Sequence, residues 1–372
     1  ERTQTFELDL AGDGGPVVPS LLRGFSAPVK LVFEPPLAIE ELATLAAKDD
    51  DAFVKWDAWQ QLASTVVLGR YDSDAEEDAL PSYLVDAFLA TLTDADAEPS
   101  LAAYSLALPD YATLALAVPD GTLDPARLCA ALKHTKRALA ETARTELRAR
   151  YDGLTAELGS GGGAAAYSVD ALSVGRRRLR NACLSYLATL EDEGVDVLAA
   201  HFDAATCMTD SIAAAAHLAE KPGDARDARL AAFYETAKKE AEDLVIDKWF
   251  AIQASADVDD ALAKVTALLE THPDFVDATP NRFRALVNTF AAANPRAFHA
   301  PDGAGYAFVA DQVIAADHKN PQLAARLCNV FGTWQRHEPN RQALMRAALE
   351  RIRDAPGLSK DTFEIADRTL TK

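Results

Sequence analysis

The sequence contains few cysteines, and none of them forms a recognisable pair. Cys129, Cys183, Cys207 and Cys328 are scattered along 372 residues, with no C-x-x-C spacing and with apolar, helix-forming neighbours. Cysteines of this kind are more often buried free thiols than disulfide partners, and free thiols are typical of a reducing compartment. The cysteines therefore predict free thiols and a cytoplasmic location.

Long apolar runs are also missing. No run approaches the roughly 18 apolar residues that a membrane-spanning helix needs, which argues against a membrane protein. No secretory signal pattern opens the chain. The first residue is Glu1 rather than methionine, so we expect this sequence to be part of a longer protein or a processed product.

Positive charge is scarce. The chain carries 37 Lys and Arg against 57 Asp and Glu, a formal net charge of −20, which repels a polyphosphate backbone and argues against a nucleic-acid partner. The one basic run is Arg176, Arg177, Arg178 and Arg180, in GRRRLRNACL. Acidic helices flank it, and short charge runs usually form a solvated helix face, so that is our interpretation.

No complete catalytic motif is present. Zinc hydrolases of the H-E-x-x-H type need two histidines one helical turn apart, and none of the seven histidines has a partner at i+4. His337-Glu338 is followed by Pro339, and Arg341 occupies the place of the second ligand. A loose G-x-G-x-x-A pattern at 159–164 follows a helix instead of a strand, which excludes a dinucleotide site. We therefore assign no catalytic and no metal-binding residue.

The sequence does contain an abrupt change of hydrophobic period. Thr3–Leu10 and Pro28–Pro35 alternate like strands around a glycine-rich turn, whereas helical periodicity begins near Ala38 and continues to the C-terminus. We predict a mainly α protein, an irregular right-handed superhelix of HEAT- or armadillo-like hairpins, preceded by a short β segment. The expected boundary separates residues 1–36 from residues 37–372. A glycine-rich surface loop is expected at 159–166.

Helix starts are the clearest local signal. Asp124-Pro125, Thr279-Pro280, Asn294-Pro295 and Asn320-Pro321 each place a capping side chain before a proline at the first helical position. The starts at Thr279 and Asn320 are close to one two-helix repeat apart.

An apolar stripe is predicted on the helix that begins near residue 52. Phe53, Trp56, Ala63 and Val67 follow a helical period there.

Three polar side chains lie early in these C-terminal helices. Gln322 and Arg326 are one turn apart after Asn320-Pro321, and Arg284 follows Thr279-Pro280. In a helical stack, early positions of successive units line the same concave surface. Spacing alone leaves two interpretations open, a binding surface or three solvated side chains, and the second is the more common.

Nine segments, taken together and in order, resemble the C-terminal part of the aminopeptidase N family, the bacterial-type alanyl aminopeptidases among the zinc-dependent gluzincins. The segments cover nearly the whole chain: Val18–Leu31, Phe53–Gln60, Leu179–Ala188, Met208–Ala214, Asp247–Ala254, Pro280–Val287, Asn294–Phe308, Asn320–Leu327 and Arg341–Ile352.

The resemblance implies that the chain ends a β-sandwich domain near residue 36 and then forms a superhelical domain that encloses a peptide-trimming chamber. It implies peptide substrates, with zinc held by an upstream catalytic domain of the same protein and none bound by this part. Arg284 and Arg326 would then face the chamber, with Gln322 beside the pocket for the first substrate side chain. The chain alone is expected to be inactive. The alternative is a free-standing helical-repeat scaffold that binds a protein partner.

Overall fold

The computed structural model describes residues 4, 5, 7, 17–29, 31–73, 79–159, 167–275 and 279–371. Helices follow one another through almost all of this length, and no β-ladder forms among the described residues. The predicted mainly α superhelix is confirmed. The glycine-rich loop at 160–166 lies outside the described residues.

The first half of the chain contains these helices: η1 (Arg23–Phe25), α1 (Ile39–Lys48), α2 (Ala52–Ser73), α3 (Ser82–Thr93), α4 (Pro99–Leu106), α5 (Tyr111–Ala117), α6 (Pro125–Thr142), α7 (Arg144–Gly159), α8 (Ala171–Leu187) and α9 (Gly194–Ala204). The second half begins with α10 (Met208–Leu218), α11 (Asp224–Lys239), α12 (Asp243–Ser255), α13 (Ala261–Thr271) and η2 (Pro273–Phe275). It continues with α14 (Pro280–Phe283), the π-helical turn η3 (Arg284–Asn288), α15 (Thr289–Ala293), α16 (Pro295–Phe298), α17 (Ala304–Asp317), α18 (Pro321–Cys328), η4 (Asn329–Arg336), α19 (Pro339–Arg353) and α20 (Lys360–Thr371).

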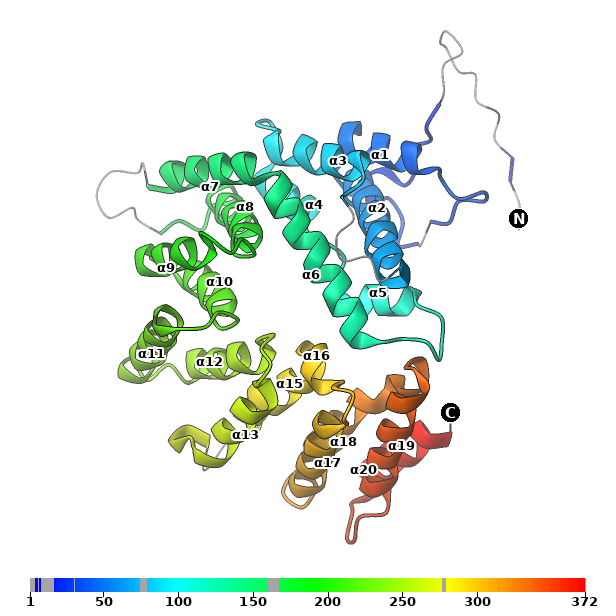
Figure 1. The fold of residues 1–372 in the computed structure, drawn as a ribbon, viewed down its shortest axis with the longest axis vertical. Helices are drawn as coiled ribbons and strands as arrows, with labels where there is room; N and C mark the ends of the chain where they lie inside the picture. Colours follow the sequence, from blue (N-terminus) through cyan, green and yellow to red (C-terminus); the bar gives the residue numbers. More distant parts are fainter. Residues whose placement is uncertain are drawn as a thin grey trace.

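The helices are arranged as a ring (Figure 1). From α9 to α11 each helix packs mainly on its neighbours in sequence, as expected of a solenoid. The C-terminal helices then turn back towards the N-terminal ones. The long helix α6 runs along the inside of the ring, where it packs on α2 on one side and on α16 on the other. Residues far apart in sequence therefore meet at the centre.

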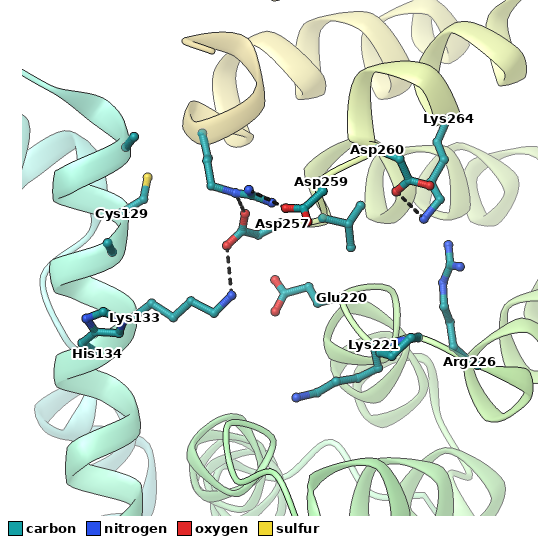
Figure 2. A pocket seen from close by; sticks show the side chains of 16 residues that line it. Cys129, Lys133, His134, Glu220, Lys221, Arg226, Asp257, Asp259, Asp260 and Lys264 are labelled. Atoms are coloured by element: carbon teal, nitrogen blue, oxygen red, sulfur yellow. Dashed lines mark hydrogen bonds and ion pairs between the residues drawn. The ribbon is translucent and has the colours of Figure 1, made fainter. Parts of the chain in front are cut away.

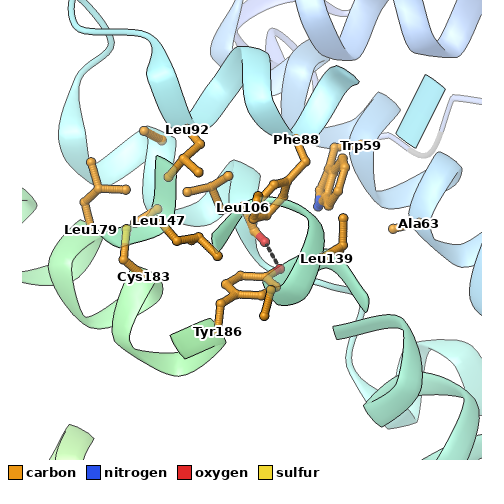
Figure 3. Close-up of a cluster of buried hydrophobic side chains, with 14 of the residues drawn as sticks. Trp59, Ala63, Phe88, Leu92, Leu106, Leu139, Leu147, Leu179, Cys183 and Tyr186 are labelled. Atoms are coloured by element: carbon orange, nitrogen blue, oxygen red, sulfur yellow. Dashed lines mark hydrogen bonds between the residues drawn. The ribbon is translucent and has the colours of Figure 1, made fainter. Parts of the chain in front are cut away.

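The N-terminal half is held by an apolar core that spans α1 to α10. At its centre Trp59, Phe88 and Tyr186 pack ring against ring, as Figure 3 shows, with centroids 5.8 and 5.0 Å apart. The polar ends of the buried rings are satisfied: Trp59 Nε1 donates to the Ala107 carbonyl at 2.8 Å, and the Tyr186 hydroxyl donates to the Leu106 carbonyl. These bonds fix the end of α4 against α2 and α8.

A second core holds α11 to α20 together. It is rich in aromatic side chains, with Phe250, Phe290, Phe298 and Phe331 all essentially inaccessible to water. Phe202 of α9 is partly buried against both cores, so the two halves are continuous at this point.

The predicted helix starts are confirmed. The side chains of Asp124, Thr279, Asn294 and Asn320 each accept from backbone N–H groups of the following first turn, and proline occupies the first helical position in all four. Two further starts have the same chemistry with glutamate as the cap, at Glu98-Pro99 and Glu338-Pro339. The longer glutamate reaches the same donors, which is why the search for small polar caps missed them.

The predicted strand at Pro28–Pro35 is wrong for the residues that the structure describes. Residues 28, 29 and 31–35 are irregular. A strand requires a neighbouring strand to complete its hydrogen bonds, and none lies beside this segment in the described part of the chain. Most of Thr3–Leu10 lies outside the described residues. The division at residue 36 stays a prediction, although α1 begins at Ile39.

The N-terminal segment is instead attached to α1 and α2. Arg23 donates to Asp49 at 2.9 Å and also pairs with Asp50, and the Gly24 N–H donates to Asp51 Oδ2 at 2.7 Å. Phe25 packs on Phe53 with ring centroids 4.8 Å apart.

This attachment covers part of the predicted stripe of α2. Ala63 and Val67 are buried in the interior, whereas Phe53 and Trp56 lie beside the N-terminal segment. Trp59, which the stripe did not include, is buried in the core.

The basic run at 176–180 is also different from the prediction. Instead of a solvated face, each guanidinium fixes α8 to a neighbour. Arg176 pairs with Glu157 at 2.8 Å, and Arg180 pairs with the buried Asp210 at 2.6 Å. Arg177 is buried and donates to the Ser168 carbonyl, and Arg178 lies over the Tyr104 ring. The run is therefore a packing element.

The ring closes where η4 meets the turn between α5 and α6. The Arg336 side chain donates to the carbonyls of Ala115, Leu116 and Val118, at 3.0, 3.1 and 3.0 Å, and pairs with Asp120 at 2.7 Å. These carbonyls are the unpaired C-terminal groups of α5, so a cation is well placed there. Backbone bonds continue the contact: the N–H groups of Gly121 and Leu123 donate to the Arg336 carbonyl, and the Leu123 carbonyl accepts from Glu338.

We call this contact between η4 and the turn between α5 and α6 the seam. Two buried histidines lie directly behind it. His299 and His337 stack with ring centroids 4.4 Å apart, and the His299 Nδ1 bonds to the Tyr306 hydroxyl at 2.8 Å. Among the described residues, neither ring nitrogen of His337 has a hydrogen-bond partner, and the residue is 1% exposed. Burial, together with the nearby Arg341 guanidinium, lowers the pKa of His337 to about 4.

The Arg336 contacts predict a measurable cost of opening the ring. Arg336→Ala removes three charge-assisted bonds and leaves carbonyls of α5 unpaired, so we expect the free energy of unfolding to fall by about 3 kcal/mol in urea denaturation. The matched control is Arg346→Ala on α19, which forms an exposed ion pair with Glu350; it should change stability by less than about 0.5 kcal/mol. Equal midpoints for the two variants would show that the seam contributes nothing.

His337 predicts a loss of stability in mild acid. Its pKa is about 4 in the folded state and its ordinary value is 6.5, so unfolding takes up a proton between these pH values and stability falls as the pH is lowered through that window. At pH 5 the expected contribution is about 2 kcal/mol. Urea midpoints at pH 7 and pH 5 measure it.

The control for this experiment is the exposed His318. His337→Phe should remove about 2 kcal/mol of the difference between pH 7 and pH 5, whereas His318→Phe should leave the difference unchanged. The explanation fails if both variants lose as much stability in acid as the unmodified chain does.

Candidate functional site

A cavity of about 710 Å³ lies inside the ring, between four segments that are distant in sequence. One wall is α6, and the others are the turn between α10 and α11, the loop between α12 and α13, and the start of α16 (Figure 2). A second cavity of about 450 Å³ shares Cys129, Lys133, Glu220, Lys221 and other residues with it. We refer to the two adjoining cavities together as the central space.

Charged side chains dominate the walls of this space. The cations are Lys133, Lys136, Arg137, Lys221, Arg226, Lys264 and Arg296, and the acids are Glu191, Glu220, Asp257, Asp259 and Asp260. Cations exceed acids here, although the chain as a whole carries a net charge of −20. The ring thus places an electropositive interior inside an acidic molecule.

One group of these charges holds the walls together. Arg296 at the start of α16 pairs with Asp257, and with Asp259 at 2.9 Å, on the loop after α12. Asp257 also accepts from Lys133 of α6 at 3.4 Å. The buried Asn294 side chain donates to the carbonyls of Ala254 and Ala256 on the same loop. This clasp fixes α6, α12 and α16 around the cavity.

A second group is not paired. Within the described ranges, Lys136 and Lys221 form no ion pair, and neither does Glu220. The half-buried His217 lies near both lysines; burial, and then the charges of Lys136 and Lys221, lower its pKa to about 3. Burial also lowers the pKa of Lys136 and Lys221 and raises that of Glu220. Lys136, His217 and Lys221 are half-buried at the edge of the cavity, whereas Glu220 is exposed to it.

The three residues predicted from the sequence lie elsewhere. Gln322 and Arg326 are exposed, one turn apart on α18, as their spacing requires. Arg284 opens the π-helical turn η3, is half-buried and donates to the side chain of Asn281. None of them lines the central space.

The structure does bring the starts of their helices together. Pro280 and Phe283 of α14, and Asn320 and Leu323 around the start of α18, line one mainly apolar cavity of about 450 Å³. The expected stacking of early helix positions is therefore present for neighbours of Arg284 and Gln322. A role for the three side chains themselves stays a prediction.

Arg282, two residues before Arg284, is the buried arginine of this segment. Its side chain is bonded to Asp247, donates to the Asp274 carbonyl at 3.0 Å and lies 5.4 Å from the Phe250 ring centroid. It shares a helical face with Leu286 and Phe290 of the core, at i+4 and i+8. That spacing is the signal that would have marked Arg282 as structural.

The described residues do not form a metal centre. No group of three or more His, Cys, Asp or Glu side chains is placed to hold an ion in the described part of the chain. The residues present therefore do not fit a catalytic zinc, and no chemical step is assigned to one here.

The four cysteines are free, as predicted. Cys183 and Cys328 are buried, and Cys129 and Cys207 are partly buried. Burial raises the pKa of Cys129, Cys183 and Cys328 to about 12, which keeps these thiols protonated and unreactive. Among the described helices, none combines the length and the apolar character that crossing a membrane requires.

The family to which the fold and the cavity belong is clear from sequence comparison. Residues 39–371 match the family described as a domain of unknown function, DUF3458_C, ARM repeats. The match covers the chain from α1 to α20. The chain belongs to this ARM-repeat family, and it is the helical C-terminal domain of aminopeptidase N-like proteins.

Individual relatives support the same assignment. The chain is 42% identical over 356 residues to Aminopeptidase N of Caulobacter vibrioides, and 36% identical over 359 residues to Aminopeptidase N of Escherichia coli K12. Each match covers 95% of this chain but only 40% and 39% of the relative. The chain thus spans about two fifths of the length of these relatives.

A solved structure has the same fold. The crystal structure of Legionella pneumophila aminopeptidase A in complex with aspartic acid matches with a TM-score of 0.80 and 28% identity, over 95% of this chain and 41% of that one. The resemblance noted from the nine segments is therefore confirmed, and the predicted helical domain of a larger aminopeptidase-like protein is correct.

Proposed function

We propose that this domain is part of a zinc aminopeptidase, in which it forms one wall of the chamber where peptides lose their N-terminal residues and limits which peptides enter. The observation that carries the proposal is the coverage of the relatives. Almost the whole chain matches proteins named Aminopeptidase N, yet it spans only about 40% of them. In this proposal an upstream domain of the same protein holds the zinc, and zinc is needed for cleavage.

The helix ring has two properties that suit the wall of a peptide chamber, a rigid frame and a polar interior. Its closed seam and its two cores make a rigid frame, and its interior is an open, charged cavity instead of an apolar core. Peptides are zwitterionic and strongly hydrated, so a polar interior accommodates them at lower desolvation cost than an apolar one. The free thiols agree with a cytoplasmic location, which we include in the proposal.

Arg284, Gln322 and Arg326 are proposed as substrate contacts from the wall side. Gln322 and Arg326 are exposed on one face of α18, and Arg326 has no ion pair within the described ranges, so its guanidinium is free to bind a peptide carbonyl or carboxylate. A free-standing scaffold is not favoured, because this chain covers only about 40% of each of three Aminopeptidase N relatives.

If the zinc is held by an upstream domain, peptide hydrolysis should require the longer protein. The 372-residue chain alone should not hydrolyse alanyl chromogenic substrates, whereas the longer protein should do so and should lose the activity to a zinc chelator. Both are measured by release of the chromophore. Chelator-sensitive turnover by the chain alone, at a rate close to that of the longer protein, would overturn the proposal.

Arg326→Ala in the longer protein tests the wall contact. The variant should keep its zinc, measured by metal analysis, and lose about tenfold in kcat/KM for tripeptides, because one charge-assisted bond to the substrate is removed. Arg346→Ala, an exposed arginine on α19, is the matched control and should retain the specificity constant. Unchanged constants for di- and tripeptides in Arg326→Ala would return this side chain to the class of solvated residues.

A further inference from the structure

Two lysines that border the central space, Lys136 and Lys221, indicate what kind of ligand it binds. Cationic side chains in proteins normally lie in water or beside a carboxylate, because burial of an uncompensated charge is costly. Lys136 and Lys221 are only partly accessible to water, and no carboxylate of the described residues lies within ion-pair distance of either. Both are half-buried, both border the cavity from opposite walls, and in the described ranges neither has an ion-pair partner.

Their surroundings concentrate positive charge further. Lys133 lies one helical turn before Lys136, so both project from the same side of α6. Figure 2 shows Lys133 reaching inward from α6, and Glu220 and Lys221 reaching inward from the turn after α10. The charge of Glu220 acts on both Lys136 and Lys221, but Glu220 forms no ion pair with either of them within the described ranges. Lys133, Lys136 and Lys221 thus line one cavity together with a single unpaired carboxylate, that of Glu220.

The space between these groups is open and preorganised. The second cavity, of about 450 Å³, is lined by Lys133, Lys136, His217, Glu220 and Lys221. Lys136 is held in position by the Tyr186 ring, whose centroid lies 5.5 Å from its Nζ. Lys133 is held by Asp257 of the clasp. A bound anion would therefore meet ammonium groups whose positions are already restricted, which lowers the entropic cost of binding.

We propose that Lys136 and Lys221, supported by Lys133, form a binding site for an oxyanion, a carboxylate or a phosphate, at the centre of the ring. Ammonium groups on opposite walls match an anion with several acceptor oxygens, each of which accepts a charge-assisted bond. His217 and Glu220 border the same site. The proposal extends the proposed function, since the carboxylate of a peptide inside the chamber is one source of such an anion; a free small anion is the other.

Direct binding to the 372-residue chain tests the site and separates the two sources. Isothermal titration is carried out with three probes: inorganic phosphate, N-acetyl-trialanine with a free carboxylate, and the same peptide as its C-terminal amide. Binding of the free acid with at least tenfold weaker binding of the amide supports a peptide source. Binding of phosphate alone supports a free anion as the source. Absence of binding by both phosphate and the acid at millimolar concentrations overturns the proposal.

Variants locate the site. Lys136→Gln with Lys221→Gln should weaken the binding of the preferred probe by at least about tenfold, because two charge-assisted bonds are lost. Lys360→Gln, which removes the same charge from an exposed lysine at the start of α20, is the matched control and should bind as the unmodified chain does. Equal loss in the double variant and the control would place the binding elsewhere.

Two features keep the result interpretable. Comparison of the acid with the amide uses the unmodified chain, so it stands even if the double variant fails to fold. The readout is binding to this chain, not peptide hydrolysis by the longer protein. Loss of the oxyanion site and failure of the proposed aminopeptidase role are therefore observed in different experiments.

Discussion

The contact between Arg336 and the end of α5 holds the two ends of the helix ring together. A solenoid of paired helices is stabilised mainly by contacts between neighbours in sequence, and nothing in that principle brings its first helices to its last. Here one guanidinium satisfies three carbonyls more than 200 residues away, and a short backbone ladder completes the seam. The central space exists because this seam and the packing of α6 on α16 bring the walls to face each other.

The polar interior follows from the same geometry. Most apolar side chains are buried in two large cores and two smaller clusters between the helices, so the side chains that face the central space are mainly polar. Some of their charges neutralise each other in the clasp of Asp257, Asp259, Arg296 and Lys133 and so fix the walls. Others, Lys136 on α6 and Glu220 and Lys221 on the turn after α10, form no ion pair among the described residues. The division between paired and unpaired charge distinguishes structural from ligand-binding roles inside the ring.

Local chemistry was readable from the sequence where it depends on adjacent residues. Helix starts such as Asp124-Pro125 were predicted because cap and proline act on the same turn. The strand at Pro28–Pro35 was mispredicted because strand structure depends on a neighbour that the described residues do not provide. Periodicity identified Phe53 and Trp56 as part of an apolar face of α2 but not what covers them, which is the N-terminal segment.

The candidate site was less accessible for the same reason. Lys136 and Lys221 come from segments 85 positions apart, and only closure of the ring makes them opposite walls. Arg284, Gln322 and Arg326 were selected by position within their helices, and the structure adds that their helix starts share an apolar cavity. Arg282 shows that a buried arginine and an accessible one two positions later are told apart only when the face of the helix is considered.

The two sides of the seam should tolerate substitution to different extents, because one side contributes main-chain atoms and the other a single arginine side chain. Arg336 recognises α5 through main-chain carbonyls, which every amino acid supplies, so the side chains at 115, 116 and 118 are free to change as far as this contact is concerned. Only an arginine presents several donors in a rigid fork, so position 336 has no equivalent replacement. Among related copies of this domain, we expect positions 115, 116 and 118 to vary while position 336 remains arginine. The seam, and with it the ring, can then persist as the rest of the sequence changes.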